Sequence, residues 1–124
     1  YYEVWWDPLM SAGSGTWIND LIGIAGGVNI FSDVEIEYPE INSESVIVND
    51  PEIIMIPVGY MGGEGEEIAK RPGWEVITAI KNDRLYTVNE DLIYKPGPRI
   101  VDGLETLAKI IHPELFEELG SYND

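Results

Sequence analysis

Residues 51–57 read Pro51-Glu52-Ile53-Ile54-Met55-Ile56-Pro57, in which the continuous apolar run Ile53–Ile56 is bounded by two prolines. A run of this length is the size of a buried strand. Because it is apolar on both faces, we expect a central strand covered on both sides, as in parallel sheets. The segments on either side are interpreted relative to this strand.

Two further segments are predicted to be strands. Residues 2–6 (Tyr-Glu-Val-Trp-Trp) are rich in β-formers and are stopped by Asp7-Pro8. Residues 84–88 follow a turn at Lys81-Asn82-Asp83. Both lie far from residues 51–57 in the sequence, which leaves room for helical connections between the strands.

A helix is predicted after the small-residue loop 11–16, with Ser14 or Thr16 as its cap and Gly26-Gly27 as its end. Its apolar face is expected to comprise Trp17, Leu21 and Ala25, with Ile18 and Ile22 beside it. Ser43 is the expected cap of a short helix over 44–48 that Asp50-Pro51 breaks. Residues 66–70 and 74–80 are two more short helical segments.

The last helix has the clearest pattern. Pro98 suits its first position, and Pro113 interrupts it before a short helix over 113–119. Apolar residues recur at helical spacing at Ile100, Val101, Leu104, Leu107, Ala108 and Ile111. The alternation of strands and helices over 124 residues predicts one α/β domain, a three-layer α/β/α Rossmann-like unit with a small, mainly parallel sheet.

The composition narrows the function classes. A formal charge of −16, from 23 acidic and 7 basic residues, repels phosphate backbones and anionic membranes, so no nucleic-acid partner is expected. The absence of cysteine excludes disulfides, thiolate metal sites and cysteine nucleophiles. No apolar run approaches the roughly 20 residues that a membrane-spanning helix needs.

The motifs that would carry chemistry are weak. The Gly13–Thr16 loop before a helix could hold a phosphate, but it lacks the GxGxxG pattern and the Walker lysine, which favours a tight turn. His112 lies at a helix end, where the helix dipole explains it better than catalysis does. No EF-hand, HExxH or GxSxG pattern occurs. We therefore predict no catalytic residue, no metal site and no cofactor, and expect that the protein is not an enzyme.

Tyr38 and Glu44 each have two interpretations. Tyr38 lies in a polar, proline-flanked stretch without periodicity, where a ring serves either ligand binding or packing. Glu44 lies in a first helical turn, where the helix dipole stabilises a carboxylate by about 0.3–1 kcal/mol. This structural role alone would explain a glutamate there.

The order of segments resembles the C-terminal lobe of the helical-backbone solute-binding proteins, which feed iron–siderophore, haem and cobalamin ABC importers. The resemblance covers nearly the whole chain. Each matching segment alone has little specificity for the family, but the segments in this order are fairly specific. The residues that carry it are Gly13–Ile18, Ala25–Phe31, Ile41–Glu44, Asn49–Ile54, Gly73-Trp74, Ala79–Tyr86, Pro96–Ile100 and His112–Phe116.

The resemblance implies specific roles. Glu44, in the Ser43-Glu44 step, corresponds to the glutamate that docks into arginine pockets of the permease dimer. Tyr38, six positions earlier, corresponds to an aromatic ligand contact, and a tyrosine there permits either stacking or direct iron or haem ligation. Trp6, the Asp7–Met10 loop with Met10, and Arg99 would face the ligand cleft; for Arg99, a salt bridge at the helix start is the alternative.

The resemblance also implies a metal-chelate ligand (a ferric siderophore, haem or cobalamin) and a location on the periplasmic or extracellular face of the membrane, lipid-anchored in the full-length protein. The chain starts at Tyr1 and matches one lobe, so we expect a piece of a longer protein whose N-terminal lobe and linking helix are absent. Exposed cleft aromatics would then favour self-association of the isolated lobe. The alternatives are a small α/β enzyme or nucleotide-binding domain using Gly13–Thr16, and a structural interaction module.

Overall fold

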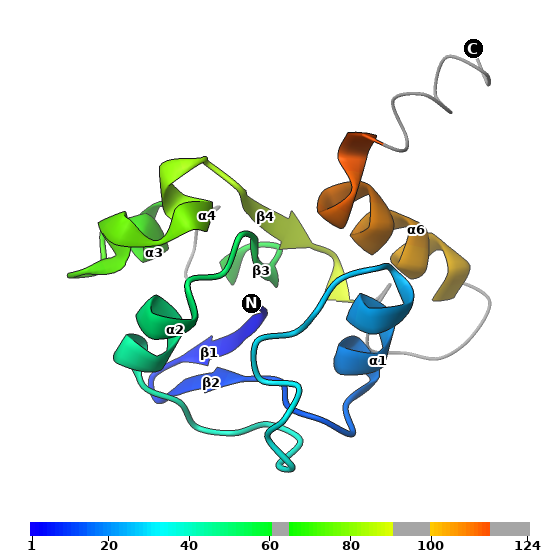
Figure 1. Ribbon diagram of the computed structural model, residues 1–124, viewed down its shortest axis with the longest axis horizontal. Helices are drawn as coiled ribbons and strands as arrows, with labels where there is room; N and C mark the ends of the chain where they lie inside the picture. Colours follow the sequence, from blue (N-terminus) through cyan, green and yellow to red (C-terminus); the bar gives the residue numbers. More distant parts are fainter. Residues whose placement is uncertain (61–64, 91–99, 115–124) are drawn as a thin grey trace.

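The computed structural model describes residues 1–60, 65–90 and 100–114. Figure 1 shows short strands at the centre and helices around them. The elements in chain order are β1 (Glu3–Trp6), β2 (Leu9–Ser11), α1 (Trp17–Ile24), α2 (Ser43–Asn49), β3 (Ile54–Pro57), α3 (Glu66–Ala69), the 3-10 helix η2 (Trp74–Val76), α4 (Thr78–Lys81), β4 (Leu85–Val88) and α6 (Ile100–Ile111).

The strands form a small mixed sheet region. β3 pairs in parallel with β4, beginning with Ile54 opposite Leu85, and β1 pairs antiparallel with β2. A parallel bridge between Tyr2 and Met55 joins the two pairs. β3 is buried along its whole length, so the predicted central strand is confirmed with a shift of one residue. β2 was not predicted; residues 7–10 were expected to be a loop.

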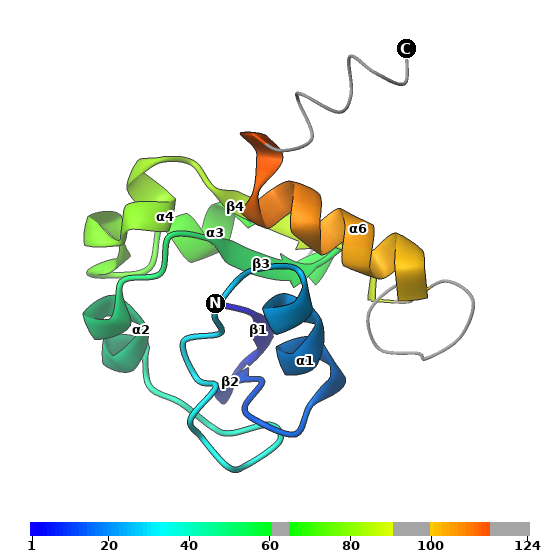
Figure 2. The same cartoon turned by 45° about the vertical axis from the view of Figure 1, so that its right-hand side comes forward.

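Helices cover both faces of these strands, which confirms the α/β fold with three layers. α1 and α6 pack together on one face, and α2, α3 and α4 lie on the other (Figure 2). One hydrophobic core lies on each face of the strands. Successive residues of β3 contribute to these two cores in turn, because side chains alternate along a strand. Ile54 and Ile56 contribute to the core that contains Trp74 and Val46, whereas Met55 contributes to the core under α1 and α6.

The buried face of α1 differs from the prediction. Ile18, Leu21 and Ile22 are buried, whereas Trp17 is 40% exposed. The apolar stripe that packs toward α6 is centred on the isoleucines and the leucine, which rotates Trp17 toward solvent. Thr16 is the predicted cap, and its side-chain oxygen accepts the Asn19 amide hydrogen at 3.2 Å.

Two other helix limits differ from expectation. The cap of α2 is Asn42, not Ser43, because the Asn42 side chain accepts the Ser45 amide hydrogen at 2.8 Å. Residues 74–80 form η2 and α4, separated by Ile77 in extended conformation. The predictions for Pro98 and for most of residues 113–119 lie outside the described residues. Among the described helices, none has both the length and the apolarity that a membrane crossing needs.

His112 joins the end of α6 to the end of α1. Its Nε2 lies 3.0 Å from the Gly26 carbonyl oxygen and its Nδ1 lies 3.2 Å from Glu114 Oε1. The hydrogen bond to the Gly26 carbonyl, followed by that to Glu114, raises the pKa of His112 above its usual 6.5. The protonated ring donates to both oxygens, so folding favours the charged form.

A pH dependence of stability follows from this contact. Because the pKa of His112 is higher in the folded state, its contribution is fully present below pH 6.5 and is lost as pH rises through the folded-state value. We expect His112→Gln to lower the urea midpoint more at pH 5.5 than at pH 8.5. An equal loss at both pH values would show that the charged ring contributes nothing.

Candidate ligand-binding site

The described residues form an open hollow of about 560 Å³ at the carboxyl ends of β1, β3 and β4. In open α/β sheets, ligands bind outside this edge, because loops from several strands converge there. The lining residues are Val4, Trp5, Trp6, Pro57, Val58, Gly59, Tyr60 and Glu90. The volume falls within the range of small-molecule sites.

Three aromatic rings line the hollow. The indoles of Trp5 and Trp6 are stacked, with centroids 4.0 Å apart and planes at 28°. The Trp6 ring also meets Tyr60 edge-on, at 5.1 Å and 89°. Trp5 is 45% and Trp6 37% exposed, whereas Tyr60 is buried. The arrangement offers flat apolar surface, with Glu90 as its charged group, and such a surface can stack against a planar or bulky apolar ligand.

A buried ion pair lies next to this aromatic group. Glu3 of β1 is fully buried, and Arg71 binds it through two hydrogen bonds of 2.6 and 2.8 Å. The Tyr1 hydroxyl donates to the same carboxylate at 2.8 Å. Burial alone would lower the pKa of Arg71, but the hydrogen bonds and charge of Glu3 outweigh it and raise that pKa.

The same carboxylate acts on Tyr60. Burial, followed by the interaction with Glu3, raises the pKa of the Tyr60 hydroxyl far above its usual value. Tyr60 therefore stays neutral at physiological pH. In the wall of the hollow, the Tyr60 side chain is thus a neutral phenol close to the ion pair of Glu3 and Arg71.

The four candidate ligand residues have different positions. Trp6 lines the hollow. Met10 is partly buried in β2, opposite Trp5 and bridged to Glu40, and does not line the hollow. Tyr38 is 38% exposed and also lies outside the hollow. The carbonyl of the next residue, Pro39, accepts the Ser11 amide hydrogen of β2. Arg99 lies outside the described residues.

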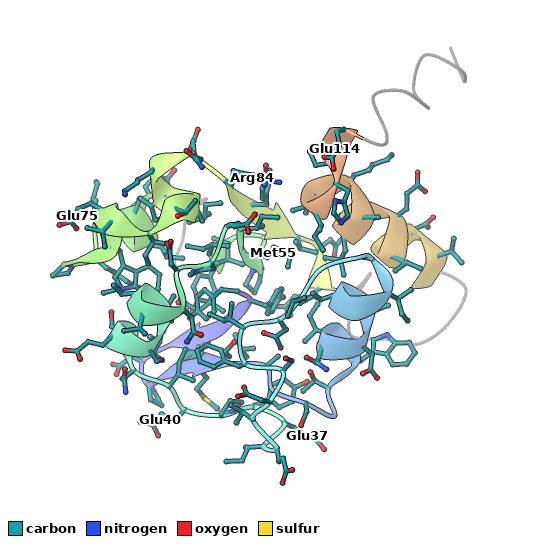
Figure 3. The ribbon with its side chains drawn as sticks, in the orientation of Figure 1. Glu37, Glu40, Met55, Glu75, Arg84 and Glu114 are labelled. Atoms are coloured by element: carbon teal, nitrogen blue, oxygen red, sulfur yellow. The ribbon has the colours of Figure 1, made fainter. Side chains whose placement is uncertain are left out.

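Glu44 is exposed in the first turn of α2, as its proposed contact with another protein requires. The sequence is acidic around it, and Figure 3 shows the labelled side chains of Glu37, Glu40 and Glu75 at the periphery of the molecule. These side chains are also exposed. α2 therefore carries an exposed carboxylate on a chain that has further exposed glutamates.

Two backbone amides of the Gly13–Thr16 loop are already hydrogen-bonded within the protein. The Gly13 amide donates to the Glu37 carbonyl at 2.8 Å, and the Ser14 amide donates to the Val34 carbonyl at 2.8 Å. A Cβ at Gly13 would lie 2.1 Å from the Ile36 carbonyl oxygen, so the two loops are in direct contact. This geometry supports the tight-turn interpretation and argues against the nucleotide-binding alternative.

Sequence reasoning missed most of the hollow. Trp5, Val58, Tyr60 and Glu90 come from three separate segments, and none was singled out as a ligand residue. One signal could have found them: each lies at or just beyond the carboxyl end of a strand, where ligand sites of α/β folds gather.

The chain is similar to known periplasmic binding proteins. Residues 1–92 match the family described as periplasmic binding protein. The ABC transporter substrate-binding lipoprotein YvrC of Bacillus subtilis (strain 168) is 30% identical over 119 residues, which cover 95% of this chain and 37% of that protein.

Two solved structures are similar in fold and sequence. A possible iron-binding (periplasmic solute-binding) protein from Staphylococcus epidermidis is 35% identical with a TM-score of 0.81, covering 90% of this chain and 43% of that one. The periplasmic vitamin B12-binding protein of Vibrio cholerae is 28% identical with a TM-score of 0.71, covering 88% and 42%. The chain therefore spans about two fifths of the length of these relatives.

Proposed function

The chain belongs to the periplasmic binding protein family, and from this we propose that it is one lobe of the substrate-binding component of an ABC importer. The observation that carries the proposal is the aromatic hollow of Trp5, Trp6 and Tyr60 at the carboxyl edge of the strands. It would form one wall of a cleft whose other wall is an N-terminal lobe. The role is capture and handover of a ligand, without catalysis.

We further propose a metal chelate as the ligand, either an iron complex or a cobalamin-like compound. The names of two similar proteins support this class, one as iron-binding and one as vitamin B12-binding. Exposed indoles also suit large ligands with flat or apolar faces, because such rings bury much area with little loss of conformational freedom. The protein would act outside the cytoplasmic membrane, and a lipid anchor is consistent with the lipoprotein relative.

Titration of the full-length protein tests this function. Cyanocobalamin, a ferric trihydroxamate and haem are added separately while tryptophan fluorescence is followed. We expect one of them to bind and to quench Trp5 and Trp6, with the quench retained in Trp17→Phe and reduced in Trp6→Phe. Trp17 lies on α1 away from the hollow, so it is a matched control. No binding by a folded protein would overturn the metal-chelate proposal.

Tyr38 is proposed to contact the ligand from outside the hollow. Tyr38→Ala in the full-length protein is expected to weaken ligand affinity about 3- to 10-fold, the equivalent of one aromatic contact. Tyr38→Phe keeps the ring and separates stacking from ligation: retained affinity indicates stacking, and a loss equal to that of alanine indicates that the hydroxyl binds. Unchanged affinity in Tyr38→Ala would make Tyr38 purely structural.

Glu44 is proposed to dock the protein onto the permease through an arginine. A carboxylate on a short exposed helix can form a charge-assisted, bidentate pair with a guanidinium. Glu44→Arg is expected to weaken binding to the permease about 30-fold or more, because it removes the pair and adds repulsion, while ligand affinity stays unchanged. Permease binding and ligand binding are measured separately for each variant.

Glu75→Arg is the matched control for Glu44→Arg. Glu75 is also an exposed glutamate in the first turn of a short helix, and the change in net charge is the same. It should leave docking almost intact. Equal loss from both substitutions would indicate a general charge effect and not a docking role for Glu44.

A further inference from the structure

The orientation of α2 depends on contacts at both of its ends. An isolated helix of seven residues is not stable in water, so its direction is set by what it packs against. At its start, Trp74 Nε1 donates a short hydrogen bond to Ser43 Oγ. At its end, Asp50 accepts from the Thr78 amide at 2.7 Å and from the Thr78 hydroxyl at 2.8 Å. Glu44 lies between these two fixed points.

The Trp74 ring is held firmly on the core side. It is fully buried, its ring lies 4.6 Å from the Arg71 guanidinium carbon, and the Tyr1 ring meets it edge-on at 6.1 Å. Arg71 is in turn fixed by its two hydrogen bonds to buried Glu3. The indole N–H is therefore a donor in a fixed position. The hydrogen bond holds Ser43 at the place where its hydroxyl oxygen can accept from this donor.

We propose that Trp74 is a positioning residue for docking: its Nε1–H sets the first turn of α2 through Ser43 and thereby aims the adjacent Glu44 carboxylate at the permease. The inference rests on the proposed function. Its physical basis is that a bidentate pair with a guanidinium demands both the position and the plane of the carboxylate. A tilt of α2 would leave Glu44 exposed and charged but misdirected.

The test uses the ligand-free full-length protein and its permease–ATPase complex in nanodiscs. Trp74→Phe keeps an aromatic ring and removes the donor, and Ser43→Ala removes the acceptor. Each is expected to weaken docking about 3- to 10-fold, the effect of one hydrogen bond, with cyanocobalamin, ferric trihydroxamate and haem affinities all unchanged from the wild type. Because both residues act through one bond, the double variant should lose no more than either single variant.

Ile77→Val is the control for general destabilisation. Ile77 is fully buried in the same segment, and its side chain belongs to the core cluster that contains Trp74. We expect this variant to lower the melting temperature while docking affinity stays at the wild-type value. A purely structural Trp74 would behave in the same way.

The outcomes separate this inference from the proposed function. If Trp74→Phe lowers the melting temperature but docks normally, or if the losses of the two single variants multiply, the positioning role is overturned while docking through Glu44 stands. If Glu44→Arg itself docks normally, the docking function is overturned and the positioning role with it.

Discussion

Trp6→Ala is expected to weaken ligand binding by the full-length protein about 10- to 100-fold, which corresponds to about 1.4–2.7 kcal/mol. Trp6 is the central ring of the hollow: it stacks on Trp5 and meets the edge of Tyr60. Its truncation removes the apolar surface that a ligand would cover. It also leaves the Trp5 indole without its stacking partner, so the loss exceeds that of one contact.

Two comparisons make this prediction specific. Trp6→Phe retains a smaller ring and should fall between the wild type and Trp6→Ala. Trp17→Ala removes an indole of nearly the same exposure from α1, outside the hollow, and should leave affinity unchanged. Calorimetric titration of the three variants checks the order. Equal affinity of Trp6→Ala and the wild type would place the ligand elsewhere.

Arg71→Met is expected to lower the free energy of unfolding by about 3–5 kcal/mol. The substitution leaves the Glu3 carboxylate fully buried without its cation, and an uncompensated buried charge is costly. The Tyr1 hydroxyl still donates to Glu3, which compensates only part of the loss. Urea denaturation of wild type and variant measures the difference.

Glu3→Gln together with Arg71→Met is the informative comparison. Replacing both charges removes the cost of the unpaired carboxylate, so the double variant should be more stable than Arg71→Met alone. Lys70→Met, a neighbouring exposed cation, should change the stability by no more than about 0.5 kcal/mol. If Arg71→Met costs no more than Lys70→Met, the ion pair does not stabilise the fold.

Local patterns predicted part of the structure correctly. The apolar run around Ile54 identified the central strand, and Thr16 capped α1 as its residue type predicts. β2 was missed because three residues carry no periodic signal and depend on pairing with β1. The exposure of Trp17 was missed because helical spacing shows which residues share a face, but not which face meets α6.

The candidate site was less predictable, for a similar reason. Trp5, Tyr60 and Glu90 are brought together only by the parallel pairing of distant strands. Trp6, which the resemblance placed at the ligand cleft, lines the hollow, and Glu44 is exposed; their roles in binding and docking stay predictions. The Glu3–Arg71 pair joins residues 68 positions apart, and no local signal marks either of them as a partner.

The contact between Gly13-Ser14 and residues 34–37 has a consequence for the entropy of binding. Backbone hydrogen bonds from Gly13, Ser14 and Ser11 hold the segment that leads into and past Tyr38, and the Gly13 position has no room for a side chain. The backbone at Tyr38 is therefore already ordered before a ligand contacts the ring, so binding would lose little affinity to the ordering of a loop.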